Sequence, residues 1–216
     1  MLADQSTLAN WLLPIIEVNQ QSYKNGELGL DNPDYWVLYT MEAMAISPKK
    51  LDAGLVCFYL FNIVHLKEGE GIFQDAGIPH AYLRGQNVEL MACSDNVIRG
   101  GLTPKYVDIV ELLKIVDCRE VTPQIISAAP QNQSEFTYKT PVNDFALAQI
   151  RVEPQQHTEL NLQSAGILLV MQGELKMQEK SAVLTLKQGE SAFITADSNV
   201  EIMSEKDGYA FLAKLP

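Results

Sequence analysis

Two basic residues, Arg99 and Lys105, flank a stretch of turn-forming residues that contains Gly100, Gly101 and Pro104. A planar guanidinium and a nearby ammonium together suit a phosphate dianion, because the guanidinium donates paired hydrogen bonds and the ammonium adds charge. Asp95 precedes Arg99 closely enough in the chain to fix its orientation. A charged loop residue is more commonly solvated surface, and this alternative stays open for both positions. The pattern therefore predicts either a phosphate-binding loop or an ordinary exposed one.

His80 is the residue best suited to hold a metal. Its imidazole would suit a borderline metal such as zinc, although a lone histidine is more commonly structural. The other two histidines, His65 and His157, form no closely spaced pair with it. The sequence predicts that His65 is a strand residue and that His157 belongs to a polar loop. The three cysteines contain no C-x-x-C pair, so reduced thiols are expected rather than a zinc site.

Composition excludes several classes of function. The 216-residue chain has a formal net charge of -11, which repels a phosphate backbone, so no nucleic-acid partner is expected. A small phosphorylated ligand is still allowed, because a local cluster of Lys and Arg can override the global field. The N-terminus lacks the features of a signal peptide, and the most apolar run, residues 55–64, is too short to span a bilayer and predicts a buried strand. We therefore expect a soluble, cytoplasmic protein with no membrane partner.

A mainly β framework must position these side chains. Apolar residues at helical spacing in 8–16 predict a first helix that Pro14 interrupts or ends, and a second helix is expected from Asp31 or Asn32 to about Ala45. Another helix is predicted roughly over 107–116, and residues 128–140 are predicted to form a linker or long loop.

Short apolar or alternating runs between turn residues predict the strands of a sandwich or barrel. These runs are 58–66, 71–75, 87–92, 96–99, 145–152, 166–171, 174–178, 182–186, 191–195, 200–203 and 209–214.

An internal repeat links two of these runs. Residues 67–76 match residues 187–196 at a constant offset of 120, with identities at Lys, Gly, Glu, Phe and Ala. A K-x-G-E sequence alone could be a common hairpin turn. Because the shared Phe and Ala lie beyond the turn, the repeat predicts two related β units.

The residues around His80 carry a family resemblance. Glu68–Phe73, followed by Asp75–Leu83 with its Pro-His-Ala-Tyr core, resembles the second conserved motif of cupin barrels as it occurs in type I phosphomannose isomerases. The run 91–105, which reads M-A-C-S-D-N-V-I-R-G-G-L-T-P-K, is similar to a string typical of that family. Further similarity at 34–36, 142–146 and 189–194 extends the resemblance over essentially the whole chain. It implies jelly-roll (double-stranded β-helix) cupin units and a zinc-dependent enzyme that interconverts mannose 6-phosphate and fructose 6-phosphate.

The resemblance also implies how the chain is divided. Residues 1–54 would be the tail of an inserted helical domain, 55–118 the second half of the catalytic cupin plus a connecting helix, and 119–216 a C-terminal non-catalytic cupin. The expected fold is thus mainly β, with one partial and one complete cupin unit and an N-terminal helical segment. At the repeat offset His80 corresponds to Val200, so the second cupin is expected to serve packing or an interface. Because roughly half the strands of the first cupin would be missing, we expect exposed apolar edges and self-association.

In the family that the chain resembles, zinc is held by a Gln, a His and a Glu, which would lie upstream of Met1, and by the residue that corresponds to His80. The resemblance assigns five residues to the sugar-phosphate pocket, with Arg99 as the catalytic one: Tyr82, Glu89, Asp95, Arg99 and Lys105. A base would remove the proton at C2, an enediol(ate) would form, and the proton would return at C1, while the metal polarises the sugar oxygens. The base could be Glu89 or a residue outside this sequence.

Two functions follow as hypotheses. In the first, the chain is a C-terminal portion of the isomerase, which alone binds zinc weakly or not at all and turns over slowly or not at all, because one ligand cannot hold the metal. In the alternative, it is a non-catalytic cupin module or subunit that binds a sugar phosphate. Another kind of metal cupin, such as an oxygenase, is disfavoured because the set of two His and one carboxylate is lacking.

Overall fold

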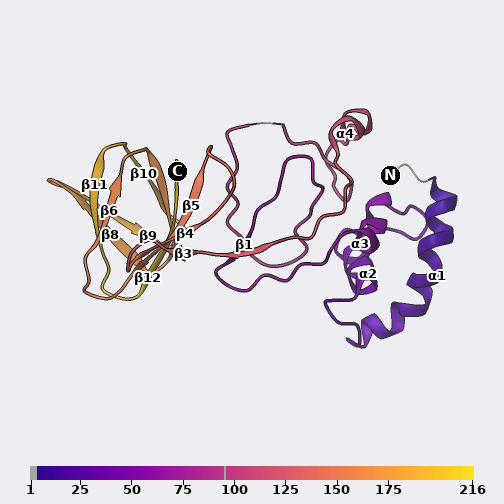
Figure 1. Ribbon diagram of the computed structural model, residues 1–216. Coiled ribbons are helices and arrows are strands. Elements are labelled where there is room, and N and C mark those ends of the chain that lie inside the picture. Colours follow the sequence, from indigo (N-terminus) through magenta and orange to yellow (C-terminus); the bar gives the residue numbers. More distant parts are fainter. Residues whose placement is uncertain (1–3, 95) are drawn as a thin grey trace. The chain divides into compact units, whose positions relative to one another are not determined.

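The computed structural model describes residues 4–94 and 96–216, which divide into two compact units (Figure 1). Of the described residues, 4–65, 74–87 and 96–123 form the first unit, and 66–73, 88–94 and 124–216 form the second. Two short segments, 66–73 and 88–94, therefore belong with the C-terminal part of the chain. The division at residues 54 and 118 that the sequence suggests stays a prediction.

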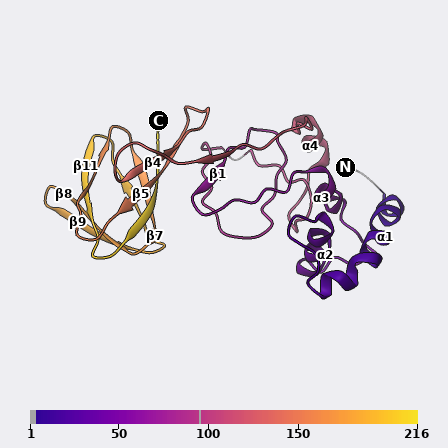
Figure 2. The ribbon, with the colours of Figure 1, turned by 60° about the horizontal axis from the view of Figure 1, so that its bottom comes forward.

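The first unit contains the helices. They are α1 (Gln5–Lys24), α2 (Pro33–Ala43), the 3-10 turn η1 (Ala53–Val56), α3 (Cys57–Leu60) and α4 (Ile109–Ile115). The helices α1, α2 and α3 lie together in both ribbon views (Figure 1, Figure 2). Asn32 caps α2 by accepting a hydrogen bond from the backbone N–H of Asp34, and Pro33 occupies the first turn, as the sequence predicts. Buried side chains from α1, α2, the η1–α3 turns and the segment just before η1 make one apolar core: Leu8, Leu12, Ile16, Trp36, Val37, Leu38, Met41, Leu51, Leu55 and Phe58.

Pro14 lies inside α1, and the prediction that it interrupts or ends the helix is wrong. A proline in a helix interior removes one backbone hydrogen bond and costs about 3 kcal/mol. On the same helix Leu8, Leu12 and Ile16 are all buried, and burial of such a side chain contributes about 1.5–3 kcal/mol. Tertiary packing of this face therefore outweighs the local cost, and α1 continues to Lys24.

The apolar run 55–64 does not form the predicted strand. Its first residues make η1 and α3, where Leu55 and Phe58 are buried three positions apart on one side, at helical rather than strand spacing. Asp52 starts these turns because its carboxylate accepts a hydrogen bond from the backbone N–H of Gly54 at 2.7 Å. Residues 87–92 and the predicted 96–99 run also lack strand structure.

The second unit is a two-layer β sandwich. A six-stranded antiparallel sheet has the order β10-β7-β12-β5-β4-β3, and a four-stranded antiparallel sheet has the order β6-β11-β8-β9. The strands are β3 (Ala129–Pro130), β4 (Glu135–Tyr138), β5 (Ala146–Val152), β6 (Thr158–Leu162), β7 (Gly166–Gln172), β8 (Glu174–Glu179), β9 (Ala182–Lys187), β10 (Ser191–Ile194), β11 (Ser198–Met203) and β12 (Gly208–Lys214). The runs predicted from 145 onward are thus confirmed. Strand β6 was not predicted, and residues 128–140 contain β3 and β4 rather than only a loop.

Alternation of apolar and polar residues builds the core of this sandwich. In β5, for example, Ala148, Ile150 and Val152 point inward and are buried. The core takes residues from both sheets, among them Leu160, Leu168, Leu175, Ile202 and Leu212. A separate two-stranded sheet pairs β1 (Glu70–Ile72) with β2 (Ile125–Ser127). The expected mainly β fold, with one complete and one partial β unit and a helical N-terminal segment, is confirmed.

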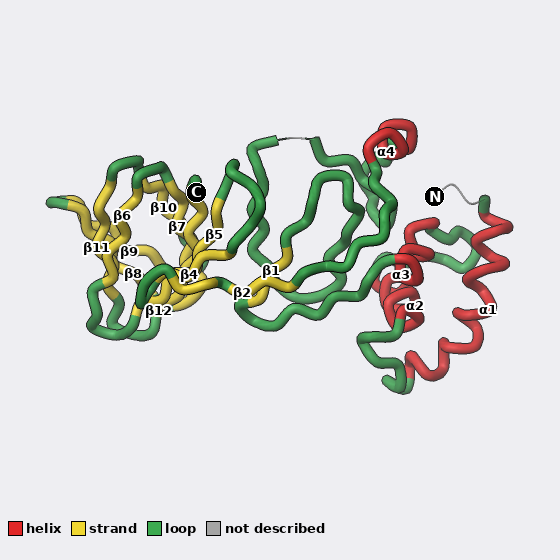
Figure 3. Tube along the Cα trace, in the orientation of Figure 1, coloured by secondary structure: helices red, strands yellow, loops and turns green. Residues whose placement is uncertain are grey.

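The middle of the chain has no core of its own. No described residue from Tyr59 to Thr137 is buried, whereas both flanking regions contribute buried clusters. Most of this stretch runs as loop between α3 and β2 (Figure 3). Large apolar side chains are exposed along it, among them Leu66, Tyr82, Met91, Val97, Tyr106 and Leu113.

None of the helices in the described part of the chain is both long and apolar enough to cross a bilayer.

Candidate functional site

The repeat found in the sequence corresponds to the same turn made twice. In the first copy, the carboxylate of Glu70 accepts a hydrogen bond from the backbone N–H of Lys67 at 2.8 Å, and the backbone N–H of Glu70 donates to the carbonyl of Lys67 at 3.0 Å. In the second copy, Glu190 and Lys187 make the same two bonds at 2.7 and 2.9 Å. The glycines between them have φ of +81° and +84°, in the left-handed region that favours glycine. The sequence repeat is thus a repeat of backbone geometry.

The loop that carries His80 is tied to the segment after α4. The carbonyl of Gly77 accepts a hydrogen bond from the backbone N–H of Asp117 at 2.8 Å, and Arg119 forms an ion pair with Asp75 at 3.1 Å. A side chain at position 77 would stand 2.8 Å from the carbonyl oxygen of Ile115, so only glycine fits this approach. His80 itself is exposed, and its Nδ1 lies 3.1 Å from the carbonyl oxygen of Ile78.

The loop between Arg99 and Lys105 is held by Asp52. One carboxylate oxygen of Asp52 accepts from the backbone N–H of Leu102 at 3.3 Å, while the other binds Gly54. Leu102 has a φ of +49°, an uncommon conformation for a bulky side chain, and the bond to Asp52 supports the loop in this shape. A Cβ at Gly54 would lie 2.7 Å from the Leu102 side chain, which explains the glycine at that position.

The structure places the predicted site residues as follows. His80 and Tyr82 belong to one loop, with ring centroids 5.8 Å apart at an angle of 66°. Arg99 and Lys105 lie at the two ends of the loop that Asp52 holds, and both are exposed. Glu89 is exposed and belongs to the second unit. Asp95 lies outside the described residues.

A buried polar cluster in the second unit escaped the sequence analysis. The carbonyl oxygen of Gly69 accepts from the hydroxyl of Tyr138 at 2.9 Å and from the amide of Gln149 at 3.5 Å, and the same amide also contacts the Tyr138 hydroxyl. Burial raises the pKa of Tyr138, so the phenol remains a protonated donor. Gln149 is one of the few buried polar residues. The alternating pattern of its strand does not indicate that its partner is Gly69, 80 positions earlier in the chain.

Within the described residues, no three His, Cys, Asp or Glu side chains come together as a metal site would require. The other two histidines have carboxylate neighbours, His65 with Asp31 at 2.9 Å and His157 with Glu201. Val200, at the position that matches His80 in the repeat, is buried in the apolar core of the sandwich. All three cysteines are free thiols.

Three further residues that the sequence analysis did not name position these loops. Arg119 and Tyr138 reach partners far away in sequence, and only the tertiary structure reveals them. Asp52 has a recognisable signal, an Asp two positions before a Gly at the start of a turn, which is typical of a side chain that accepts from the backbone. Its second contact, with Leu102, is not readable from the sequence.

Known proteins similar to this chain are sugar-phosphate isomerases. Residues 134–205 match the model of the mannose-6-phosphate isomerase cupin domain. Mannose-6-phosphate isomerase from Salmonella typhimurium is 42% identical over 149 residues, which cover 68% of this chain and 38% of that enzyme. The enzyme from Bos taurus is 39% identical over 160 residues, covering 70% of this chain and 38% of the relative. The matched segment therefore covers well under half the length of these curated relatives.

Solved structures agree with the sequence matches. A point mutant of phosphomannose isomerase from Salmonella typhimurium superposes with a TM-score of 0.75 at 31% identity, covering 98% of this chain and 55% of that one. The mannose 6-phosphate isomerase of the same organism bound to its substrate, fructose 6-phosphate, and to zinc superposes with a TM-score of 0.74, also at 31% identity and with the same coverage. The match extends across both units of the chain.

Proposed function

We propose, from the premise that this chain belongs to the mannose-6-phosphate isomerase family, that it supplies the sugar-phosphate-binding part of an enzyme that interconverts mannose 6-phosphate and fructose 6-phosphate. The observation that carries the proposal is the loop from Arg99 to Lys105, which Asp52 holds in a strained shape with a cation at each end. A held loop keeps two cations in a defined arrangement at little entropic cost, which favours binding of a phosphate dianion. A relative of similar fold binds fructose 6-phosphate and zinc.

The chemistry expected of such a site is proton transfer between C2 and C1 of the sugar through an enediol(ate). Arg99 and Lys105 would fix the phosphate, so that C1 and C2 always meet the same surface. Tyr82, Glu89 and Asp95 are proposed as further substrate contacts, and Glu89 is a candidate for the base. Arg99 would also stabilise the developing negative charge of the enediol(ate).

Zinc does not fit the described residues alone. His80 would be one imidazole ligand, but no second and third donor lie beside it among the described residues. A complete zinc site would therefore need donors other than these. We infer that this chain by itself binds zinc weakly and turns over mannose 6-phosphate slowly or not at all.

The lack of a ligand cluster among the described side chains favours a second candidate function. In this second function the chain is a non-catalytic module or subunit that binds a sugar phosphate. No complex that contains the chain would then convert the substrate. Self-association is proposed for either function, because the exposed apolar side chains between residues 59 and 137 favour association in water.

A coupled assay for fructose 6-phosphate formation with added zinc, run beside a binding titration with fructose 6-phosphate, tests the proposal. The isolated chain should bind the sugar phosphate and show little turnover, and Arg99→Ala should weaken binding roughly 30-fold or more, since a charge-assisted bidentate contact is worth about 2–5 kcal/mol. Arg99→Lys should restore only part of the affinity, because an ammonium lacks the planar fork. Lys206→Ala, in the exposed turn before β12, is the control.

Adding the remaining part of a related isomerase separates the two candidate functions. Turnover that appears on mixing and disappears with His80→Ala would support the enzyme. Binding without turnover would support the module. Binding that is indifferent to Arg99→Ala would overturn the pocket assignment, and vigorous turnover by the isolated chain would show that its own residues complete the metal site.

A further inference from the structure

Three polar side chains share the inner face of the sandwich in the second unit. The register pairs Glu135 with Ile150, Thr137 with Ala148, and Lys214 with Ala146. Directly paired residues of an antiparallel sheet point to the same face, and the three partners on β5 are buried. Glu135, Thr137 and Lys214 therefore stand on the face that carries the apolar core deeper in the sandwich.

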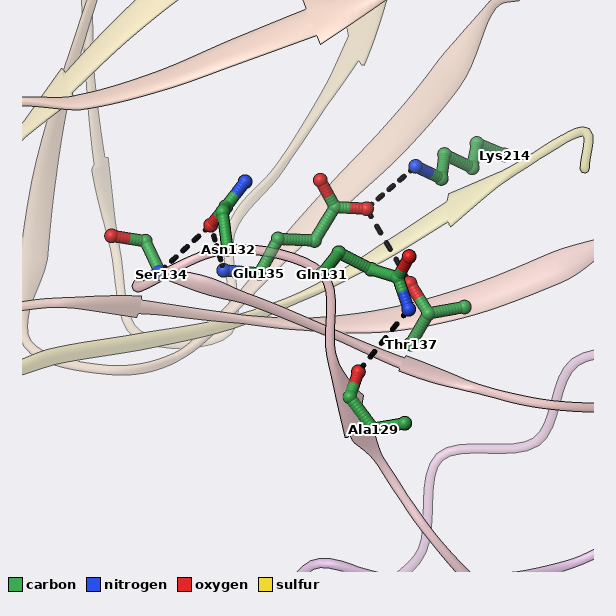
Figure 4. Close-up of polar contacts among 7 residues, drawn as sticks. All are labelled: Ala129, Gln131, Asn132, Ser134, Glu135, Thr137 and Lys214. Atoms are coloured by element: carbon green, nitrogen blue, oxygen red, sulfur yellow. Dashed lines mark hydrogen bonds and ion pairs between the residues drawn. The ribbon is translucent and has the colours of Figure 1, made fainter.

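These side chains converge on one carboxylate (Figure 4). The ammonium of Lys214 lies 2.6 Å from Oε1 of Glu135, and the hydroxyl of Thr137 donates to the same oxygen at 3.5 Å. The side chains of Lys214 and Glu135 are only 25% and 14% exposed. Asn132 fixes the preceding turn, because its side-chain oxygen accepts from the backbone N–H groups of Ser134 and Glu135 at 2.8 and 2.7 Å.

The pair borders an open pocket of about 560 Å³ at this end of the sandwich. Lys139, Thr140, Gln131 and Phe145 also line the pocket. Its charged side chains are two lysines and one carboxylate, and Pro216 also lines it. Its volume falls within the range found for small-molecule sites, and both apolar and polar side chains line it.

A partly buried ion pair is poor evidence of a purely structural role. Taking two charges out of water costs about as much as their attraction returns, and packed apolar residues would serve stability equally well. Beside a pocket, the same pair offers what a polyhydroxylated anion requires. The ammonium groups of Lys139 and Lys214 attract the anion, and the Glu135 carboxylate and the Gln131 and Thr140 side chains bind hydroxyls.

We propose that this pocket is a binding site for a small anion that carries several hydroxyl groups, a sugar phosphate or a sugar acid. The site lies within the second unit and uses none of the residues assigned to the isomerase pocket. The proposal does not rest on the proposed function, and it gives the sandwich of the second unit a ligand-binding role beyond packing.

Titration of ¹⁵N-labelled protein, followed by amide shifts, tests the site. The titration uses the Arg99→Ala variant, which lacks the phosphate contact of the proposed isomerase pocket. Shifts that persist in this variant therefore report on the pocket beside Glu135 and Lys214. The probes are fructose 6-phosphate, gluconate, inorganic phosphate and sorbitol. We expect saturable amide shifts at residues 131–140 and 212–214 with fructose 6-phosphate or gluconate. Phosphate should give weaker shifts, and sorbitol should give none. Whichever of fructose 6-phosphate and gluconate binds more tightly identifies the preferred anionic group as a phosphate or a carboxylate.

Two variants assign the binding to the lysines. Lys139→Ala should weaken it about tenfold, as expected for one lost contact to a charged group. Lys214→Met combined with Glu135→Gln removes both charges of the pair while keeping the side-chain volumes, and it should abolish saturation. Lys176→Ala, an exposed lysine on β8, is the matched control. Absence of saturation with every probe up to about 20 mM, beyond the range of useful affinity, would overturn the proposal. Saturation that is unaffected by both lysine variants would overturn it equally.

Discussion

At residues 67–70 and at residues 187–190 the chain makes the same turn, yet only the second copy leads into a layer with a core. There the turn is joined to β7 by bonds between Gly189 and Val170 and between Val170 and Glu190, at 2.8 and 3.0 Å. The strand that follows, β10, completes a six-stranded sheet. In the first copy the following strand, β1, pairs only with β2, and no described residue from Tyr59 to Thr137 is buried.

The difference shows which interactions are local and which are not. A glycine with positive φ and a carboxylate that accepts from the backbone N–H three positions earlier form the turn in either setting. A core forms only where enough strands present apolar faces to one another. The loops that carry His80 and Arg99 belong to the stretch without a core, where Asp52, Arg119 and backbone contacts take over the positioning.

The largest expected effect comes from one substitution made in both regions. Leu168 is fully buried in the sandwich, while Leu113 on α4 is 56% exposed. Leu168→Ala should lower the free energy of unfolding by about 2–5 kcal/mol, because it leaves a cavity, whereas Leu113→Ala should change it by less than about 0.5 kcal/mol. Urea unfolding followed by circular dichroism measures both. Equal losses would contradict the claim that the stretch containing α4 lacks a core like that of the sandwich.

A smaller effect is expected where the second unit holds the first copy of the turn. Tyr138→Phe removes the hydroxyl that donates to the Gly69 carbonyl and should cost about 1–2 kcal/mol, since a buried acceptor loses a partner. Amide hydrogen exchange at residues 69–72 should accelerate more than exchange in β5.

Tyr209→Phe, on β12 of the same sheet, is the control for this substitution. Burial raises the pKa of Tyr209 to about 12, and it also raises the pKa of Tyr138. An equal change in exchange at residues 69–72 in both variants would show that the Tyr138 hydroxyl is not what holds the turn.

The smallest effect compares the two glycines of the repeated turn. A side chain at a φ near +80° costs about 1 kcal/mol at either position, because an L-residue is strained there. Gly189→Ala should therefore lower the thermal midpoint of the sandwich by a few degrees. Gly69→Ala should leave that midpoint unchanged and only speed exchange at β1, since no core follows it. A matching drop in both variants would mean that the first copy unfolds together with the sandwich.

Several features were readable from the sequence because they depend on neighbouring residues. The helix start at Asn32 and Pro33, the alternating strands from residue 146 onward and the repeated turn all follow from local patterns. The resemblance carried by residues 68–105 indicated the family. The predictions failed where long-range packing overrides local preference: Pro14 remains inside a helix, and the apolar run from Leu55 becomes helical turns because Leu55 and Phe58 join the core with α1 and α2.

The sequence by itself determined the family, the mainly β secondary structure and the residue types of the candidate site, because these depend on composition and on the order of neighbouring residues. Only the tertiary structure decided which loops are held and by what. Asp52 contacts Leu102 across 50 positions, Tyr138 contacts Gly69 across 69, and Lys214 meets Glu135 across 79. Such contacts require that distant strands and turns be assembled first, and no local pattern encodes the partner of a single hydroxyl, carboxylate or ammonium group.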